Sequence, residues 1–401
     1  LGEDDAGATS VDWYLIRTDG TGLVKTGALA AIHAAGLRAG PPIPTAWTGQ
    51  GVLFATNEAD NSNVWRIPIA LDTGRPAGPA EPLTSGTSVE RSPSVSASGH
   101  IVFASTVVNV DVWRVPIDER TGTATGALER VTDSAASDRL RNVSADGRSL
   151  VFISSRTGRD EVWSKDLETG LERQLTERGA SDAMLSPNGS SIAFARAEGN
   201  STRLELVDLR GGPPTPLCAD CDITADWSPT GEAVLFGRGL PSRLLLYDLG
   251  SASETELASH PRWNLHQARF SQDGRWVAFH TTNSPNVRQI YAAATSGRAA
   301  VTVQSWVPIV TDHGCHPNWS RDGSLVYHFS FRDGAFCPWV QRVDPGTKQP
   351  AGQPAPVLHL HDPRLRVASG AAATSDVKGG YFYFTATGST GHIWLMDRPG
   401  G

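Results

Sequence analysis

Short apolar runs separated by polar turn residues recur along almost the whole chain. Each run is about four to six residues long and rich in Val, Ile, Phe and Trp, which is typical of β-strands. Pairs such as Asp146-Gly147 and Asp322-Gly323 separate the runs, and their glycines supply the positive φ that hairpin turns require. Helical periodicity is almost absent. The pattern therefore predicts an all-β protein.

Four such runs make up a unit that repeats along the chain. The unit opens at a Ser-x-x-Gly turn, often carries Trp in its third run, and closes with a short run such as Val131-Thr132. An aromatic residue in the second run recurs roughly every 42 to 55 residues, at Phe54, Phe103, Phe152, Phe194, Phe236, Phe279, Tyr327 and Phe382. A four-stranded sheet cannot bury both of its faces alone, and radial packing against similar sheets buries them. The repeat therefore predicts a closed β-propeller.

The spacing predicts a single β-propeller domain over 1–401 with eight four-stranded antiparallel blades, and seven blades are the alternative. We expect complete blades at about 44–86, 87–134, 135–179, 180–220, 221–264, 265–314 and 315–362. The last segment has strands at 381–384 and 392–396 but lacks a closing strand, whereas 11–18 and 23–26 resemble outer strands without inner ones. These complementary defects predict that 363–401 and 8–30 combine into one closing blade shared by the N- and C-terminal segments.

Composition narrows the classes of partner. With 39% hydrophobic and 19% charged residues, the chain is globular, and its net charge of −7 gives no basic footprint for nucleic acid. No run of 18 apolar residues is present, so we expect no membrane span. The sequence begins at Leu1 without a visible secretory signal, and we interpret it as a processed or excised piece.

The four cysteines do not form a recognisable metal motif. Cys218 and Cys221 make one CxxC, but a second CxxC is absent, so the four-thiolate zinc pattern is not satisfied. The pair is interpreted first as a loop disulfide, and a redox pair or two plain thiols remain alternatives. Cys315 and Cys337 would begin the first and third strands of one blade, about 10 Å apart, which is beyond the reach of a disulfide.

The repeats resemble the TolB-type, WD-like β-propeller family over nearly the whole chain. The resemblance rests on Phe270-Ser271-Gln272-Asp273-Gly274-Arg275-Trp276-Val277-Ala278-Phe279 and on Trp319-Ser320-Arg321-Asp322-Gly323. More narrowly, 63–68, 218–221 and 332–345 are similar to the propeller region of acidobacterial sensor and kinase-associated proteins. That resemblance implies an extracytoplasmic, periplasmic or secreted location. The chain contains neither a glycine-rich phosphate loop nor a His-Arg-Asp catalytic loop, so no kinase is expected within it.

Residues on one face of the expected propeller are the candidates for a site, because loops held by a rigid scaffold usually carry function. The loops that lead into the inner strands share this face with those between the second and third strands. The candidate ligand-binding residues are Arg91, Arg139, Asp182, Asp222, His266, Gln267, His313, His316, Arg332 and Arg364. Arginines pair with carboxylates in two-point geometry, although solvated surface charge is the alternative for them.

Histidines concentrate between His260 and His361, and they suggest a metal site. Neutral imidazole is a common ligand of divalent metal ions, and His266, His313 and His316 could converge from adjacent inner strands. Solvated or backbone-bonded histidines are the structural alternative, and direct contact with a ligand is a third. His280 and His328, at the ends of second strands, are interpreted as structural. No catalytic residue and no cofactor beyond this divalent ion is predicted.

Three functions remain open at this stage. The first is a binding or sensing module whose channel mouth recognises a protein, a peptide, or a small-molecule or oligosaccharide ligand. The second is a metal-dependent carbohydrate-active enzyme, a polysaccharide lyase or hydrolase, because the related oligogalacturonate lyases have a similar fold and several His ligands with a Gln. The third is a purely structural or assembly domain. No Gly-x-Ser-x-Gly elbow is present, which excludes a fused serine peptidase of the prolyl-oligopeptidase kind.

Overall fold

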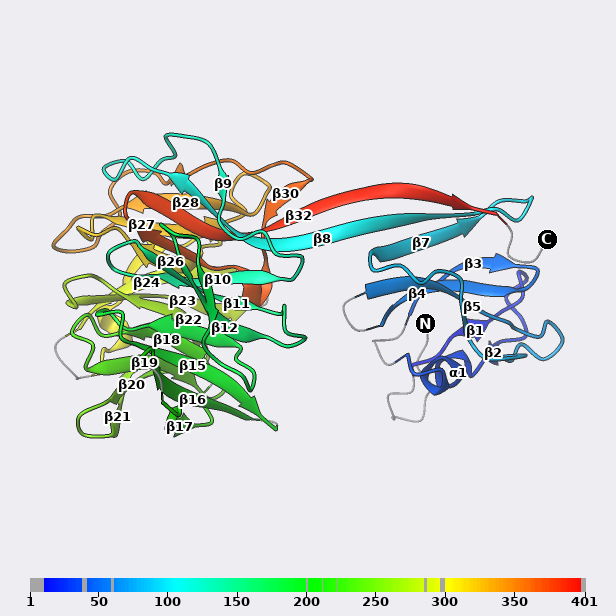
Figure 1. The fold of residues 1–401 in the computed structure, drawn as a ribbon, viewed down its shortest axis with the longest axis horizontal. Coiled ribbons are helices and arrows are strands. Elements are labelled where there is room, and N and C mark those ends of the chain that lie inside the picture. The colour runs from blue at the N-terminus through cyan, green and yellow to red at the C-terminus, as the bar shows by residue number, and fades with distance from the viewer. Residues whose placement is uncertain are drawn as a thin grey trace. The chain divides into compact units, whose positions relative to one another are not determined.

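The structure is a computed structural model that divides into two compact units (Figure 1). It describes residues 11–37, 42–58, 61–199, 201–210, 212–221, 223–284, 287–295 and 300–397. Unit 1 contains the described residues of 1–108 and 389–401, and unit 2 contains those of 109–388. Each unit is described separately below.

Unit 2 contains five separate four-stranded antiparallel sheets, and in each sheet consecutive strands are neighbours. The first two are β10 (Asp138–Val143), β11 (Ser149–Ser154), β12 (Glu161–Asp166) and β13 (Glu172–Gln174), then β14 (Asp182–Leu185), β15 (Ser191–Glu198), β16 (Ser201–Asp208) and β17 (Thr215–Ala219). The third is β18 (Ile223–Trp227), β19 (Ala233–Arg238), β20 (Arg243–Asp248) and β21 (Ser253–Ala258). The last two are β22 (Asn264–Phe270), β23 (Trp276–Ser284), β24 (Val287–Ala294) and β25 (Val307–Val310), then β26 (Cys315–Trp319), β27 (Leu325–Ser330), β28 (Cys337–Arg342) and β29 (Ala355–Pro356). The propeller fold is confirmed, but the prediction of eight blades is wrong, as is the alternative of seven, because the described part of the chain forms five four-stranded blades.

The turn between the first and second strands of a blade is built by the Ser-x-Asp-Gly sequence. In the first blade the Ser144 hydroxyl donates to Oδ1 of Asp146 over 2.5 Å, and the same oxygen accepts the backbone N–H of Arg148 over 3.0 Å. Gly147 has a φ of 75°, a left-handed value that favours glycine. The same Ser–Asp bond recurs at Ser271 and at Ser320, so a local sequence signal fixes this turn in several blades.

The first strands of the five blades form a closed ring with β31 (Ser375–Lys378), and each packs against its two neighbours in the ring. A hydrogen bond links every neighbouring pair. Backbone N–H groups of Val143, Leu185 and Phe270 donate to the side chains of Asp376, Asn142 and Asp226, respectively. The indoles of Trp227 and Trp319 donate to the carbonyls of Met184 and Arg269, and the Asn318 amide donates to the Ser375 carbonyl. Side-chain hydrogen bonds thus hold the ring together in addition to apolar packing.

The last position of the ring combines strands that precede the five blades in the sequence with strands that follow them. β31 pairs with the start of β32 (Tyr381–Met396), β32 lies beside β8 (Ile101–Pro116), and β8 pairs with β9 (Glu129–Arg130). The Ile117 amide donates to the Gly380 carbonyl over 2.9 Å. The closing blade predicted from 363–401 and 8–30 is therefore wrong. In unit 1, β1 (Tyr14–Leu15) and β2 (Val24–Lys25) pair with each other as a two-stranded sheet.

Two strands are longer than the repeat predicts, and this changes the blade count. Phe103 and Trp113 were expected on separate strands, but both lie on the sixteen-residue β8. The connecting segment Thr106-Val107-Val108-Asn109-Val110 has neither Gly nor Pro and is mostly β-branched, so as a whole it favours a continuous strand over a turn. The segments 381–384 and 392–396 likewise lie on the single strand β32.

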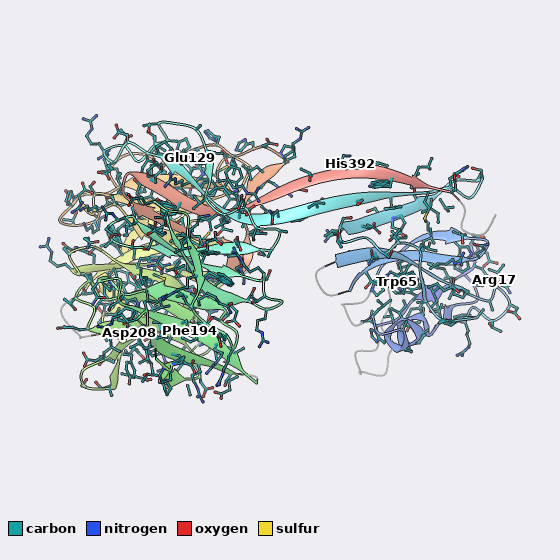
Figure 2. All side chains as sticks on the ribbon, in the orientation of Figure 1. Arg17, Trp65, Glu129, Phe194, Asp208 and His392 are labelled. Carbon is teal, nitrogen blue, oxygen red and sulfur yellow. A yellow bond between two sulfur atoms is a disulfide. The ribbon has the colours of Figure 1, made fainter. Side chains whose placement is uncertain are left out.

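The core of unit 2 lies between adjacent blades. The aromatic residues that mark the repeat, among them Phe152, Phe194, Phe236 and Phe279, are almost completely buried. Phe194, labelled in Figure 2, belongs to a cluster that combines Ile153 of the preceding blade with residues of its own blade. The radial packing inferred from the repeat thus accounts for the burial of these side chains.

Unit 1 combines strands with a short helix. Its strands are β3 (Pro44–Thr48), β4 (Gly51–Glu58), β5 (Asn61–Ile67), β6 (Glu81–Pro82) and β7 (Val89–Val95), with the pair β1–β2 and parts of β8 and β32; its helix is α1 (Ala28–Ala34). The Asp12 carboxylate accepts the N–H groups of Gly27 and Leu29 at the start of α1. Trp13 packs edge-on against Phe54 at 5.4 Å between ring centroids, and this contact anchors the N-terminal segment to β4.

The remaining elements are short. The strand β30 (Leu365–Val367) pairs with β32, and two 3₁₀ turns cover Val303–Ser305 and Gly370–Ala372. No helix in the described part of the chain has the length and apolar character needed to cross a membrane.

Breaking the link between β31 and β10 is expected to destabilise unit 2. Asp376→Leu would leave the buried Val143 N–H without its acceptor, which we expect to lower the free energy of unfolding by about 1–3 kcal/mol. Asp376→Asn retains an oxygen acceptor and should cost less. Urea denaturation followed by tryptophan fluorescence measures both variants, and equal midpoints for the two would contradict this role of the carboxylate.

Candidate functional site

Three inner strands pair irregularly with the second strand of their blade. The pairing with the second strand shifts between Leu140 and Asn142, between His266 and Arg269, and between Cys315 and Asn318. Such bulges re-aim side chains and are common beside functional sites. Two bulge residues, Gln267 at φ 50° and His316 at φ 56°, adopt the left-handed conformation, which is uncommon outside glycine. Both residues belong to the ligand-binding set predicted from the sequence.

Three histidines lie close together, His266 on β22, His280 on β23 and His316 on β26. The ring of His280 lies 5.5 Å from the ring of His266 and 5.5 Å from that of His316, measured between centroids. His280 and His316 are buried, and His266 is half-buried. The backbone N–H of His316 donates to Nδ1 of His280 over 3.5 Å, whereas Nδ1 of His316 is buried without a hydrogen-bond partner in the described structure. An imidazole nitrogen therefore remains available within the cluster.

Burial keeps these imidazoles neutral. Desolvation lowers the pKa of His316 to about 3, and the nearby guanidinium of Arg288 acts in the same direction. Burial, followed by the charge of His316, lowers the pKa of His280 well below its usual value, and burial with Arg288 lowers the pKa of His266. Neutral imidazoles can accept a proton or a hydrogen bond, or bind a cation.

Charged side chains from neighbouring blades lie beside the histidines. Arg141 is buried, and its Nε lies 3.3 Å from Oδ1 of Asp182, while its terminal nitrogen donates to the Ser181 carbonyl over 3.0 Å. Burial raises the pKa of Asp182 and of Asp226, and the charge of Arg269 opposes the rise in both cases. The centre of the ring therefore contains both signs of charge in a poorly solvated setting, which strengthens electrostatic interaction with a polar ligand.

A cavity of about 580 Å³ lies beside the histidines, between the blade β18–β21 and the blade β22–β25. Its lining combines Leu240, Leu244 and Leu265 with the polar residues Asp220, Arg238, Ser242, His266 and Gln267. A cavity of this size with a few converging polar groups is typical of a ligand-binding site. The structure thus brings His266 and Gln267 of the predicted set together with a cavity.

The rim of the cavity is cross-linked. Cys218 and Cys221 form a disulfide, the first interpretation of the CxxC, and Cys315 and Cys337 are free thiols. The Arg238 guanidinium donates to the Ala219 carbonyl over 3.2 Å and pairs with Glu254 over 2.6 Å. Leu240 follows on the same rim and is 95% exposed, which leaves an apolar side chain in solvent beside the cavity.

Of the other predicted residues, Arg139 and Asp182 belong to the charged group around Arg141, whereas the rest lie elsewhere. Arg139 pairs with Asp160, and Arg332 pairs with Asp312 over 2.6 Å. His313 and Arg364 are exposed, and neither ring contacts nor hydrogen bonds join His313 to the other histidines in the described structure. Arg91 is exposed on β7 of unit 1, and Asp222 lies outside the described residues. The metal site of His266, His313 and His316 remains a prediction.

Sequence reasoning missed several residues of the cluster. His280 was interpreted as structural, although it stands directly opposite His266 in the antiparallel pairing of β22 and β23. The partner of His266 can be found by counting residue pairs along the two strands, outward from the Asp273-Gly274 turn, and by allowing one bulge. Arg141 and Arg269 lie at inner-strand bulges, and no local sequence signal marks the side to which a bulge residue points.

Comparison with known proteins supports the propeller fold and part of the sequence resemblance. No family model matches the chain. The chain is 31% identical over 134 residues to a protein TolB homolog of Chlorobium chlorochromatii, which covers 32% of this chain and 30% of that protein. It is 37% identical over 84 residues to the Tol-Pal system protein TolB of Anaeromyxobacter dehalogenans, covering 21% of this chain and 19% of that protein. The matches therefore span less than a third of the length of these relatives.

A solved structure with a similar fold is also known. The structure of putative TolB from Agrobacterium tumefaciens aligns with a TM-score of 0.54 and 18% identity, over 70% of this chain and 98% of the other. An oligogalacturonate lyase in complex with manganese aligns with a TM-score of 0.42 and 14% identity, over 76% of this chain and 89% of the other. The first similarity supports the fold alone, and the second is too low to support an argument.

Proposed function

We propose that this chain, a TolB-like β-propeller, is a protein-binding module that acts through the cavity beside β22. The observation that carries the proposal is the cavity of about 580 Å³ with His266 and Gln267 in its wall and the exposed Leu240 on its rim. An apolar anchor beside a depression with a few polar groups is typical of a surface that receives a side chain of a protein partner.

The electrostatics suit a polar segment of the partner. Arg238 lines the cavity, and His266 joins the cavity to the buried imidazoles and arginines at the centre of the ring. Because these groups are held by bulged strands and by the Cys218–Cys221 disulfide, little side-chain order has to be gained on binding. The name of the Anaeromyxobacter dehalogenans relative assigns that protein to a Tol-Pal system, which is consistent with protein partners.

We propose an extracytoplasmic location for the module. The Cys218–Cys221 disulfide supports it, since disulfides persist in oxidising compartments. The narrower kinship with acidobacterial sensor and kinase-associated propellers remains a prediction from the sequence, as does the metal-dependent lyase or hydrolase.

Placing a charge at the exposed leucine on the rim is expected to weaken partner binding. A photo-crosslinking residue in place of Leu240 should yield a discrete protein adduct in the source cells, and excess unlabelled propeller should compete for it. Unlabelled Leu240→Asp should compete at least about tenfold less well, because a charge would then have to be desolvated at an apolar contact.

Leu171 provides the matched control. It is 73% exposed, in the turn between β12 and β13 and outside the cavity lining. A crosslinker at Leu171 should give no such adduct, and Leu171→Asp should compete like the unaltered protein. Equal adducts from both positions, or none from Leu240, would refute a binding role for this rim.

A further inference from the structure

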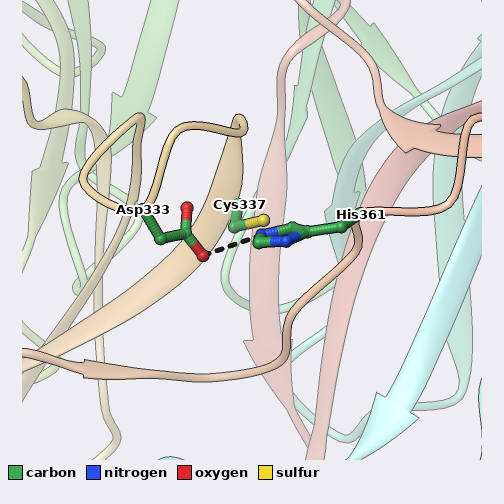
Figure 3. Close-up of side chains that lie close together, drawn as sticks. All are labelled: Asp333, Cys337 and His361. Atoms are coloured by element: carbon green, nitrogen blue, oxygen red, sulfur yellow. Dashed lines mark hydrogen bonds and ion pairs between the residues drawn. The ribbon is translucent and has the colours of Figure 1, made fainter.

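A second cluster of metal-ligating side chains lies in unit 2, apart from the cavity lining. Asp333 follows β27, Cys337 begins β28, and His359 and His361 lie between β29 and β30. Figure 3 shows Asp333, Cys337 and His361 converging, and their ligand atoms lie within 4.8 Å of one another. His359 joins them, because its Nδ1 lies 2.7 Å from the same Asp333 oxygen that lies 2.8 Å from Nε2 of His361.

Packing in the apolar core fixes the positions of these side chains. Leu360 separates the two histidines and is buried in the apolar cluster that also contains Cys337. Both histidines reach Asp333 while the residue between them enters the core, as an extended His-x-His segment allows. The backbone N–H of Leu360 donates to Sγ of Cys337 over 3.5 Å, so the segment is held against the thiol. The arrangement is thus fixed by packing in addition to the polar contacts.

The four side chains offer two imidazole nitrogens, one carboxylate oxygen and one sulfur. Such a mixed set suits zinc, which takes four ligands at about 2.0–2.3 Å in tetrahedral geometry. Calcium and magnesium prefer sites made of oxygen ligands, and a thiol beside two imidazoles is a poor site for them. We propose that Asp333, Cys337, His359 and His361 bind a zinc-type divalent cation.

Partial exposure gives an ion a route to the site. The side chains of His359 and His361 are 53% and 46% exposed, that of Asp333 is 17% exposed, and Cys337 is buried. The ion approaches from the histidine side and displaces the two His–Asp hydrogen bonds. The thiol proton of Cys337 passes to solvent as the sulfur becomes a thiolate ligand. The site stands independently of the proposed protein-binding function, because none of its residues lines the cavity.

Cobalt binding tests whether the sulfur is a ligand. Titrating the full chain with Co²⁺ is expected to produce a thiolate-to-cobalt absorption band in the near ultraviolet that saturates at one ion per chain. Cys337→Ser should abolish the band. Cys315→Ser is the matched control, because Cys315 is the other buried free cysteine of the same blade and lies outside the cluster, and it should leave the band unchanged.

Zinc affinity tests the histidines without disturbing the core. His361→Ala replaces a half-exposed side chain and should weaken Zn²⁺ binding by about 100-fold or more in calorimetric titration, since even loss of an outer partner costs about 10–100-fold. His392→Ala, at an exposed histidine of β32 outside the cluster, should bind Zn²⁺ like the unaltered chain. The proposal is overturned if the unaltered chain shows no saturable Zn²⁺ binding, or if His361→Ala and Cys337→Ser both retain full affinity. In that event the cluster is an ordinary His–Asp ion-pair network.

Discussion

Lowering the pH from 7 to 5 is expected to destabilise unit 2 by about 2 kcal/mol for each fully buried imidazole. Burial lowers the pKa of His316 to about 3 and that of His328 to about 4. An unfolded histidine titrates near pH 6.5, so below that pH the unfolded chain binds protons that the folded chain does not. The stability contributed by the neutral imidazoles is therefore complete above about pH 6.5 and is lost as the pH falls toward the folded pKa values.

Buried carboxyl groups with a raised pKa stabilise the folded state as the pH falls, which is opposite to the effect of the buried imidazoles. Burial raises the pKa of Asp111 to about 6, and it also raises the pKa of Asp182 and Asp226, so these groups take up protons more readily in the folded state. The net acid effect is consequently smaller than the sum over the histidines.

Comparison with a histidine variant isolates the imidazole contribution. His328→Leu should reduce the loss of stability between pH 7 and pH 5 by about 2 kcal/mol, because it removes the buried imidazole. Urea denaturation at the two pH values measures the difference. The same acid loss in His328→Leu and the unaltered chain would mean that His328 is not held neutral by burial.

Removing the guanidinium of Arg141 is expected to cost about 3–5 kcal/mol of unfolding free energy at pH 7, because Asp182 then stays buried without its ion-pair partner. Arg141→Met retains most of the apolar stem, so the loss reports mainly on the charge. Adding Asp182→Leu to Arg141→Met should recover part of the stability, since it removes the unpaired carboxylate.

An exposed ion pair provides the comparison. Arg210 pairs with Asp208 over 2.7 Å on the surface, where 86% of the arginine side chain is exposed. Arg210→Met is expected to leave the urea midpoint unchanged within error. If Arg141→Met also left it unchanged, or if the double variant were less stable than Arg141→Met, the buried pair would not have the role assigned to it.

The parts of the fold that depend on neighbouring residues could be predicted from the sequence. The turn at Ser271 and Asp273 is a local hydrogen-bonded motif, and Gly274 adopts the positive φ that the sequence requires of it. The burial of Phe279 followed from its place in the repeat, because a residue that recurs at the same position in every sheet faces the same interface. Local chemistry and periodicity were sufficient for these features.

The number of blades depends on long-range pairing, which the repeat does not encode. Phe54 and Phe152 occupy the same place in their repeats, yet Phe54 lies on β4 of unit 1 and Phe152 on β11 of unit 2. The strand predicted around each of these two residues is formed. The pairing of strands was decided instead by β8 and β32, two sixteen-residue strands that are neighbours in one sheet, and a single repeat contains no signal for this pairing.

The candidate sites likewise contain some residues that local sequence identifies and others that only the fold brings together. His266 and Gln267 were found because loops leading into inner strands are recognisable by position, and both line the cavity. Cys337 and His361 lie 24 positions apart, and only the fold brings the segment after β29 back across the start of β28. The residues of this second cluster therefore could not be grouped from spacing.

The ring position that β31 and β32 fill beside β8 has a consequence for how unit 2 forms. Its two halves are separated by more than 250 residues, so the five complete blades precede the last partner of β10 along the chain. Until residues 375–388 dock, β10 and β26 each lack one ring neighbour, and closure carries the entropic cost of a very long loop. Docking of this segment would then be a late and slow step of folding, and until it docks a nascent chain would expose the apolar faces of its first and last blades to solvent.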